Sequence, residues 1–189
     1  MLSARSLVSR RGGAVISLFV ALAVALAGCS LGTGADSGTA SGTPTYQFGV
    51  QTKTSGCKAN GPLPDSECTP GAIFPDATVS QICESGYASS VRNVTTSVKN
   101  NVYAEYGITT HYTGQYEVDH LVSLELGGSN DIANLWPEAA SPTPGFHQKD
   151  QVENYLHDQV CSGKIPLKQA QIDIATNWLA VYNQMQSGG

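Results

Sequence analysis

The 189-residue sequence predicts an α+β fold, and three observations support this prediction. Residues 116–126 alternate between two faces, as a half-buried strand does, and a Gly-Gly turn and a short second apolar run follow at 127–136. Segments with helical periodicity lie on both sides of this unit. Four cysteines after residue 45 offer cross-links. We therefore expect a strand–turn–strand–helix core with flanking helices, braced by disulfides.

The first 29 residues have the features of a lipoprotein signal peptide. Arg5, Arg10 and Arg11 form a positive start, and the apolar run 14–27 is shorter than the roughly 20 residues that span a bilayer. Residues 26–29, Leu-Ala-Gly-Cys, resemble a bacterial lipobox. The resemblance implies that Cys29 becomes the lipidated first residue of the mature chain. The alternative is an ordinary signal peptide whose cleavage site happens to contain a cysteine.

Residues 30–45 consist almost entirely of small and polar residues, with too little apolar content to pack. We expect this segment to be a flexible tether between a lipid anchor and one folded domain at 46–189. The predicted location is the cell membrane, with the domain outside the cytoplasm, and the expected state is a monomer.

The charge balance is unusual for a protein that acts on nucleic acid. The full chain has 10 basic and 15 acidic residues, and the predicted leader contains three of the Arg residues and no acid. The mature chain therefore has 7 basic against 15 acidic residues, a net charge of −8. Since non-specific affinity for nucleic acid depends on Lys and Arg, this balance argues against tight, processive binding.

The four remaining cysteines are Cys57, Cys68, Cys83 and Cys161, an even number in a chain predicted to be exported. This pattern favours two disulfides, for which three pairings are possible. Proximity in sequence favours Cys57–Cys68, which leaves Cys83–Cys161 to join the N-terminal half to the C-terminal helices. A zinc site is the alternative, although the spacings lack the CxxC pairs of zinc ribbons.

Helical periodicity appears in three segments. Apolar residues at three- and four-residue steps predict a helix over 89–106, with Gly107 at its C-terminal cap. A second helix is expected over 146–161, and Pro166 opens a third. Two tryptophans, Trp136 and Trp178, are expected in the core.

The predicted strand 116–126 contains an Asp-His pair. Along this strand His120 lies on the apolar face and Asp119 on the opposite face. The segment 127–131 supplies the turn, and residues 132–136 form the return strand, which Pro137 ends. A neutral imidazole can accept a proton near neutral pH, and a carboxylate is a hard oxygen donor for a cation.

The Asp-His pair, the Gly-Gly turn and the Asn-Leu-Trp-Pro segment at 134–137 resemble the HNH endonucleases of the His-Me finger, or ββα-metal, class. The resemblance covers about residues 68–182. It implies a metal-dependent endonuclease that hydrolyses phosphodiester bonds of DNA or RNA. In that pattern His120 is the general base and Asn134 orients it. Asp119 and His147 bind one divalent cation, Mg²⁺ or alternatively Mn²⁺.

Two basic residues are candidate substrate contacts, Arg92 and Lys149. Two features depart from the family pattern. Val122 and Ser123 stand where a Pro is usual, and the CxxC zinc pairs of many HNH proteins are absent. The second departure leaves disulfides to brace the hairpin.

Each candidate residue also has a structural explanation. His120 could be a satisfied core residue, His147 a helix cap and Asn134 a turn residue, while His157 is expected to be solvated. The competing function is a catalytically inactive ββα module that binds a partner or a cell-envelope polymer. The net charge of −8 favours this competitor, and the Asp-His pair favours the enzyme.

Overall fold

The computed structural model describes residues 46–188. The predicted signal peptide, the lipidation of Cys29 and the tether at 30–45 lie outside the described residues. Within 46–188, no helix is both long and apolar enough to cross a membrane.

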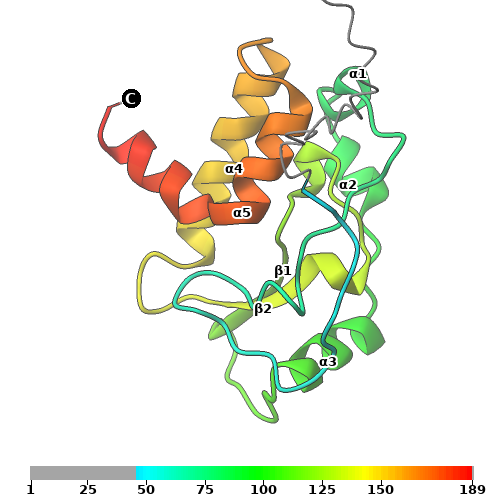
Figure 1. The fold of residues 1–189 in the computed structure, drawn as a ribbon, viewed down its shortest axis with the longest axis vertical. Helices are drawn as coiled ribbons and strands as arrows, with labels where there is room; N and C mark the ends of the chain where they lie inside the picture. The colour runs from blue at the N-terminus through cyan, green and yellow to red at the C-terminus, as the bar shows by residue number, and fades with distance from the viewer. Residues whose placement is uncertain (1–45, 189) are drawn as a thin grey trace, which may run out of the picture. The chain divides into compact units, whose positions relative to one another are not determined.

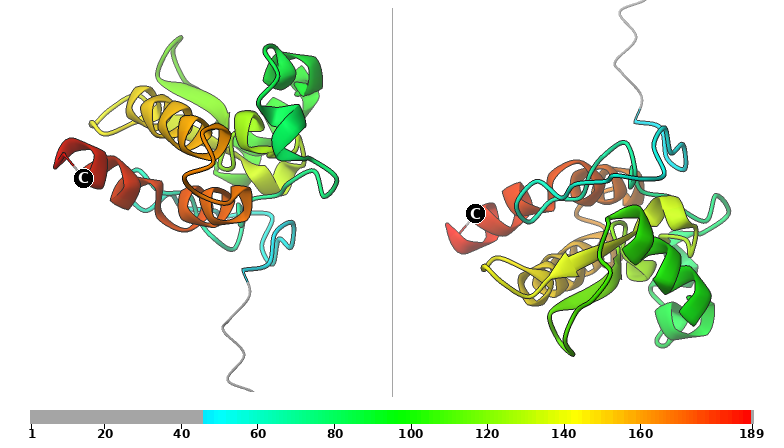
Figure 2. Two further views of the ribbon diagram at one scale, coloured as in Figure 1. Left: turned by 90° about the horizontal axis from the view of Figure 1, so that it is seen from above. Right: turned by 90° about the horizontal axis from the view of Figure 1, so that it is seen from below.

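The described chain combines helices with one two-stranded antiparallel sheet, which confirms the α+β class. The β-hairpin is followed by α4 and α5, which lie side by side (Figure 1; Figure 2). The more specific ββα-metal fold remains a prediction. The elements are α1 Val79–Ile82, α2 Tyr87–Val91, α3 Thr96–Glu105, β1 Tyr116–His120, β2 Leu135–Ala139, α4 Phe146–Cys161 and α5 Leu167–Gln186, with 3-10 turns at Leu124–Leu126 and Ile132–Asn134.

Apolar side chains form two clusters, one on each side of the hairpin. The larger cluster joins α4 and α5 to the residues after β1, and it includes Trp136 and Trp178, as predicted. The smaller cluster packs α3 against the hairpin through Val102, Val118 and Leu135. The hairpin is therefore buried on both faces, which explains why its polar residues need partners inside the protein.

The predicted strand 116–126 is wrong in its second half, because β1 ends at His120. Beyond that point the side chain of Asn134 makes two hydrogen bonds to the backbone of Val122. It accepts from the Val122 N–H (2.8 Å) and donates to the Val122 carbonyl (3.0 Å). Ser123 then caps the 3-10 turn at 124–126. The Asn134 side chain thus bonds the backbone where a neighbouring strand would otherwise do so. For this reason the sequence alternates between apolar and polar residues as far as 126, although the strand ends at 120.

The predicted return strand 132–136 is shifted along the chain. Residues 132–134 form a 3-10 turn, and β2 runs over 135–139, with Pro137 opposite Val118 inside the strand. Proline lacks the donor that an interior ladder needs. A two-stranded sheet has only edge strands, however, and an edge strand tolerates proline.

The predicted helix 89–106 is two helices. α2 ends at Val91, and α3 begins at Thr96, after Thr95 accepts a hydrogen bond from the N–H of Val98. Threonine is a favoured cap, and this capping signal interrupts the apolar periodicity. The prediction for Gly107 is confirmed, since it follows the helix with a φ of 67°.

The predictions for the C-terminal half are confirmed. α4 has the predicted bounds, and Pro166 precedes α5. The disulfides are Cys57–Cys68 and Cys83–Cys161, the pairing that sequence proximity favours. The second bridge joins the end of α1 to the end of α4.

Candidate functional site

The Asp-His pair lies at the end of β1, where its two side chains face different elements. Asp119 contacts Lys149 on α4, whereas His120 faces Asn130 in the connection between the strands. This opposite orientation is what a strand requires of neighbouring residues. The site therefore has two halves, with an imidazole on one side and a charged network on the other.

The imidazole of His120 is buried, with 2 % of its surface exposed. Its Nε2 lies 3.2 Å from Oδ1 of Asn130. Because that oxygen is an acceptor, Nε2 carries the proton and Nδ1 keeps its lone pair. Among the described residues, Nδ1 has no hydrogen-bond partner. The ring is thus held by one nitrogen and free at the other.

The surroundings of His120 keep it neutral. Burial lowers the pKa of the imidazole to about 4, although Asp119 and the hydrogen bond that the ring donates to Asn130 act in the opposite direction. Arg92 is close enough to lower this pKa further. At neutral pH the ring is therefore an acceptor and carries no charge.

Asn130 is a site residue that the sequence analysis missed. Its Nδ2 donates to the carbonyl of Val91 (2.8 Å), and its Oδ1 accepts from the N–H of Asn93 (3.0 Å). These two bonds fix the side chain against the segment after α2, so the oxygen points at His120. In the sequence Asn130 has the features of an ordinary turn residue after Gly-Gly, and no local pattern marks it as a site residue.

Asn134 is fully buried and contacts backbone, not the His120 ring. Its Oδ1 accepts from the N–H groups of Ala72 (3.2 Å) and Val122 (2.8 Å). Its Nδ2 donates to the carbonyls of Val122 (3.0 Å) and Ser129 (2.8 Å). The predicted backbone bonding across the hairpin is therefore present, and it shapes the connection that contains Asn130.

Lys149 occupies the other half of the site, and its side chain is fully buried (0 % exposed). Its ammonium donates to Oδ2 of Asp119 (2.7 Å), to the carbonyl of His120 (2.7 Å) and to the carboxylate of Glu153. All three donor hydrogens are used within the protein. This placement differs from the expected substrate-binding role, because a buried, fully bonded ammonium has no donor left for a phosphate.

The carboxyl groups around Lys149 differ in protonation. Burial tends to raise the pKa of Asp119, but the Lys149 ammonium outweighs it, and the pKa is lowered. Burial raises the pKa of Glu153 to about 7 and that of Glu138 well above its usual value. Among the described residues the Glu138 oxygens have no hydrogen-bond partner, and the negative charges of Asp119 and Glu153 act together with burial to raise its pKa. Of the three carboxyls, Glu138 is the one whose raised pKa most favours the protonated form.

The remaining predicted site residues lie at the surface. His147 is exposed at the start of α4, and its ring packs on Phe146 with centroids 4.3 Å apart. Arg92 is exposed at the end of α2, on the His120 side of the site. Within residues 46–188, no cluster of three closely spaced His, Cys, Asp or Glu donors includes Asp119 or His147.

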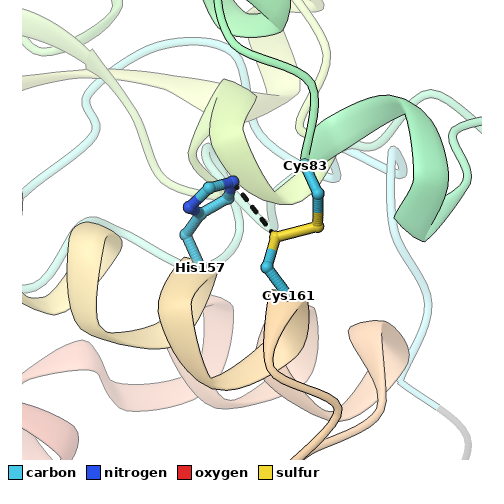
Figure 3. A group of neighbouring side chains, drawn as sticks. All are labelled: Cys83, His157 and Cys161. Carbon is cyan, nitrogen blue, oxygen red and sulfur yellow. Dashed lines mark hydrogen bonds between the residues drawn. A yellow bond between two sulfur atoms is a disulfide. The ribbon is translucent and has the colours of Figure 1, made fainter.

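A different group has metal-binding residue types. The ligand atoms of Cys83, His157 and Cys161 lie within 4.8 Å of one another, and such a group could hold a metal ion (Figure 3). The two sulfurs are joined in a disulfide, however, so neither is a thiolate. The prediction that His157 is solvated holds only in part, because its side chain is 26 % exposed while its Nε2 contacts the carbonyl of Ile82 at 3.0 Å.

Searches of family models, curated proteins and solved structures found no match to this chain. The chemistry of the site must therefore be inferred from its own residues.

Proposed function

We propose that residues 46–189 form an endonuclease that hydrolyses phosphodiester bonds of nucleic acid, with His120 as the general base. The observation that carries this proposal is the free Nδ1 of His120. Buried polar atoms are nearly always hydrogen-bonded, so an orphaned acceptor on an oriented ring calls for an explanation. An attacking water molecule bound at Nδ1 supplies one.

The electrostatics are consistent with this role. A general base must be unprotonated before the reaction, and a pKa of about 4 ensures this at neutral pH. The same low pKa makes the ring a weak base. A bound phosphate would raise the pKa, since a nearby negative charge favours the imidazolium ion. Arg92 is the exposed cation on this side, suited to contact that phosphate.

The divalent cation, Mg²⁺ or Mn²⁺, that we expected at Asp119 and His147 remains a prediction, and the observed arrangement does not fit it. Oδ2 of Asp119 already accepts a hydrogen bond from Lys149 at 2.7 Å. A cation bound at the other oxygen of this carboxylate would lie close to an ammonium that nearby carboxyl groups hold in its charged form, and the two positive charges would repel each other. The proposed role of His120 therefore stands independently of a metal.

A second function is favoured by two observations. His120 is 2 % exposed, and the mature net charge is −8. Both suit a catalytically inactive module that binds a partner or a cell-envelope polymer. In that case the buried site stabilises the hairpin, and no nucleic acid reaches it.

The test is a cleavage assay with residues 30–189 on plasmid DNA and on structured RNA. Reactions contain Mg²⁺, Mn²⁺ or excess EDTA. We expect His120→Ala to lower the rate by about 10²–10⁴-fold, the usual cost of removing a positioned base. The matched control is His111→Ala, which removes an exposed imidazole outside the site.

The outcomes separate the alternatives. Cleavage that survives EDTA means that no divalent cation takes part, and loss of cleavage in EDTA means that the reaction requires one. Absence of cleavage under every condition contradicts the proposal and favours the binding module. A melting temperature for each variant shows whether His120→Ala acts on the fold instead of the reaction.

A further inference from the structure

Cys83, His157 and Cys161 form a cluster that the proposed nuclease site does not use. We call it the α1–α4 cluster. Cys83 is the C-terminal cap of α1, and the other two residues lie one turn apart on α4 (Figure 3). Nε2 of His157 lies 3.4 Å from Sγ of Cys161. The disulfide thus has an imidazole in contact with one of its sulfurs.

We propose that the α1–α4 cluster is a redox-gated zinc site, in which reduction of the disulfide frees Cys83 and Cys161 to bind Zn²⁺ together with His157. Thiolate sulfur and imidazole nitrogen are the donors that zinc prefers. In the oxidised protein the disulfide braces α1 against α4. In the reduced protein the bound metal would link α1 to α4 in place of the disulfide.

The spacing supports a shared metal. Bonds of about 2.3 Å to sulfur and about 2.0 Å to nitrogen, at a tetrahedral angle, place S and N about 3.5 Å apart. The observed separation of 3.4 Å between Cys161 and His157 already matches this value. After reduction, the Cys83 sulfur must turn away from its partner, through rotation about its Cα–Cβ bond, and His157 must release the carbonyl of Ile82.

His157 can present the required lone pair. Its Nε2 now donates to the carbonyl of Ile82 at 3.0 Å, so the proton must move to Nδ1 before Nε2 binds metal. Nδ1 lies 4.0 Å from a carboxylate oxygen of Asp158. Metal-bound histidines usually donate their other N–H to a carboxylate, carbonyl or water, and Asp158 is positioned to accept with a small movement.

Solvent has access to the cluster. A surface pocket of about 410 Å³ adjoins it and is lined by Cys83, Glu84, Glu125, Asn154 and His157. Cys161 is exposed, whereas Cys57 and Cys68 of the other disulfide are 3 % and 0 % exposed. A reductant therefore reaches Cys83–Cys161 first, and water can fill the fourth zinc position.

The chemistry balances with one reductant and one metal ion. A dithiol gives two electrons and two protons to the Cys83–Cys161 bond, yielding two thiols while the dithiol closes to its own disulfide. Zinc then displaces the two thiol protons and binds two thiolates and a neutral imidazole. In the test, a phosphine replaces the dithiol, because it reduces disulfides to thiols without adding competing thiolates.

The experiment measures zinc in the purified protein after phosphine reduction, zinc addition and gel filtration. We expect about one zinc ion per chain in the reduced protein and none in the oxidised protein. A chromogenic chelator gives the affinity, and Co²⁺ substitution gives thiolate charge-transfer bands. Circular dichroism reports whether each sample is folded.

Two variants test the ligands and two serve as controls. His157→Gln should weaken zinc binding at least about tenfold, given that even outer-shell changes cost 10–100-fold. Cys83→Ser/Cys161→Ser should abolish it. Cys57→Ser/Cys68→Ser should retain it, and Asn154→Ala is the matched control on the pocket wall.

Some results overturn the proposal. They are the absence of zinc in reduced wild type, unchanged affinity in His157→Gln, or zinc retained by Cys83→Ser/Cys161→Ser. If Cys57→Ser/Cys68→Ser does not fold, the comparison of reduced wild type with His157→Gln decides. Zinc content is measured without any nuclease assay, so this inference can fail independently of the proposed function.

Discussion

His120 and Lys149 are the two buried basic groups of the site, and their surroundings shift their pKa values in opposite directions. Burial lowers the pKa of His120 to about 4. Burial also acts against the Lys149 ammonium, but Asp119, Glu153 and Glu138 together outweigh it and raise the pKa. At neutral pH the site therefore holds a neutral imidazole and a charged ammonium. The two residues are linked directly, because the Lys149 ammonium donates a hydrogen bond to the backbone carbonyl of His120.

At the residue scale, we expect Lys149→Met to destabilise the protein by about 3–5 kcal/mol, because it leaves buried carboxylates without their cation. Urea denaturation measures this loss. Adding Asp119→Asn to Lys149→Met should restore part of the stability, since it removes one of the uncompensated charges. A loss below about 1 kcal/mol for the single variant would mean that the network relaxes into solvent.

The protonated carboxyls predict how stability depends on pH. Glu138 and Glu153 have pKa values raised in the folded state, so the fold binds protons that the unfolded chain releases. Their contribution is present below the unfolded pKa, near 4.5, and declines as pH rises towards the folded values, about 7 for Glu153. The lowered pKa of His120 acts in the opposite direction between about pH 4 and 6.5, so the fall in melting temperature should be clearest as pH rises from about 6.5 through about 7.

Glu138→Gln tests which residue is responsible. The amide is neutral at every pH and nearly the same size, so the variant should lose less stability than wild type across this range. Glu67→Gln is the matched control at an exposed site. An identical pH dependence in wild type and Glu138→Gln would contradict the protonated state of Glu138.

At the element scale, the connection between β1 and β2 builds the candidate site. Asn134 bonds both backbone groups of Val122 and the carbonyl of Ser129, so the connection folds back over the end of β1. Asn130 is thereby placed against His120. The HNH resemblance led us to expect that Asn134 orients the base, and the structure places Asn130 at the ring instead.

The two disulfides should differ in their contribution to stability. Cys83–Cys161 spans 78 residues of sequence and Cys57–Cys68 spans 11. Since cross-linking a longer loop removes more entropy from the unfolded chain, we expect losses of about 4–5 and about 3 kcal/mol on replacement by Ala pairs. Guanidinium denaturation of both variants without zinc checks the order. The reverse order would show that native packing around the buried Cys57–Cys68 bridge dominates.

At the scale of the whole molecule, the charge and the predicted anchor bear on where the protein acts. Without the predicted leader the net charge would be −8, which disfavours tight binding to nucleic acid, so the proposed function requires that a substrate be held locally, and Arg92 is our candidate contact. The described helices provide no membrane span. We predict that lipidation of Cys29 attaches the protein to a membrane.

Cys29→Ala tests this attachment in a bacterial host. A multiply acylated protein binds membranes firmly, whereas a chain without acyl groups has no such anchor. We expect wild type to enter the detergent phase on partitioning and Cys29→Ala to remain in the aqueous phase. Wild type found in the aqueous phase would exclude the lipid anchor.

The sequence by itself determined the elements that depend on local patterns. The bounds of α4, the start of α5, the burial of the two tryptophans and the presence of disulfides follow from periodicity, proline position and cysteine count. The alternation of Asp119 and His120 between two faces follows from strand geometry. These features require no knowledge of distant neighbours.

The tertiary structure alone decided what surrounds the site residues. The end of β1 at His120, the contact of Asn130 with the imidazole and the burial of Lys149 all arise between segments that are distant in sequence. A lysine on a helix is expected to be exposed to solvent. Lys149 is buried because three carboxyl groups from other parts of the sequence and of its own helix surround its ammonium. The pKa of each buried group depends on such neighbours, so the chemistry of this site could not be read from the sequence.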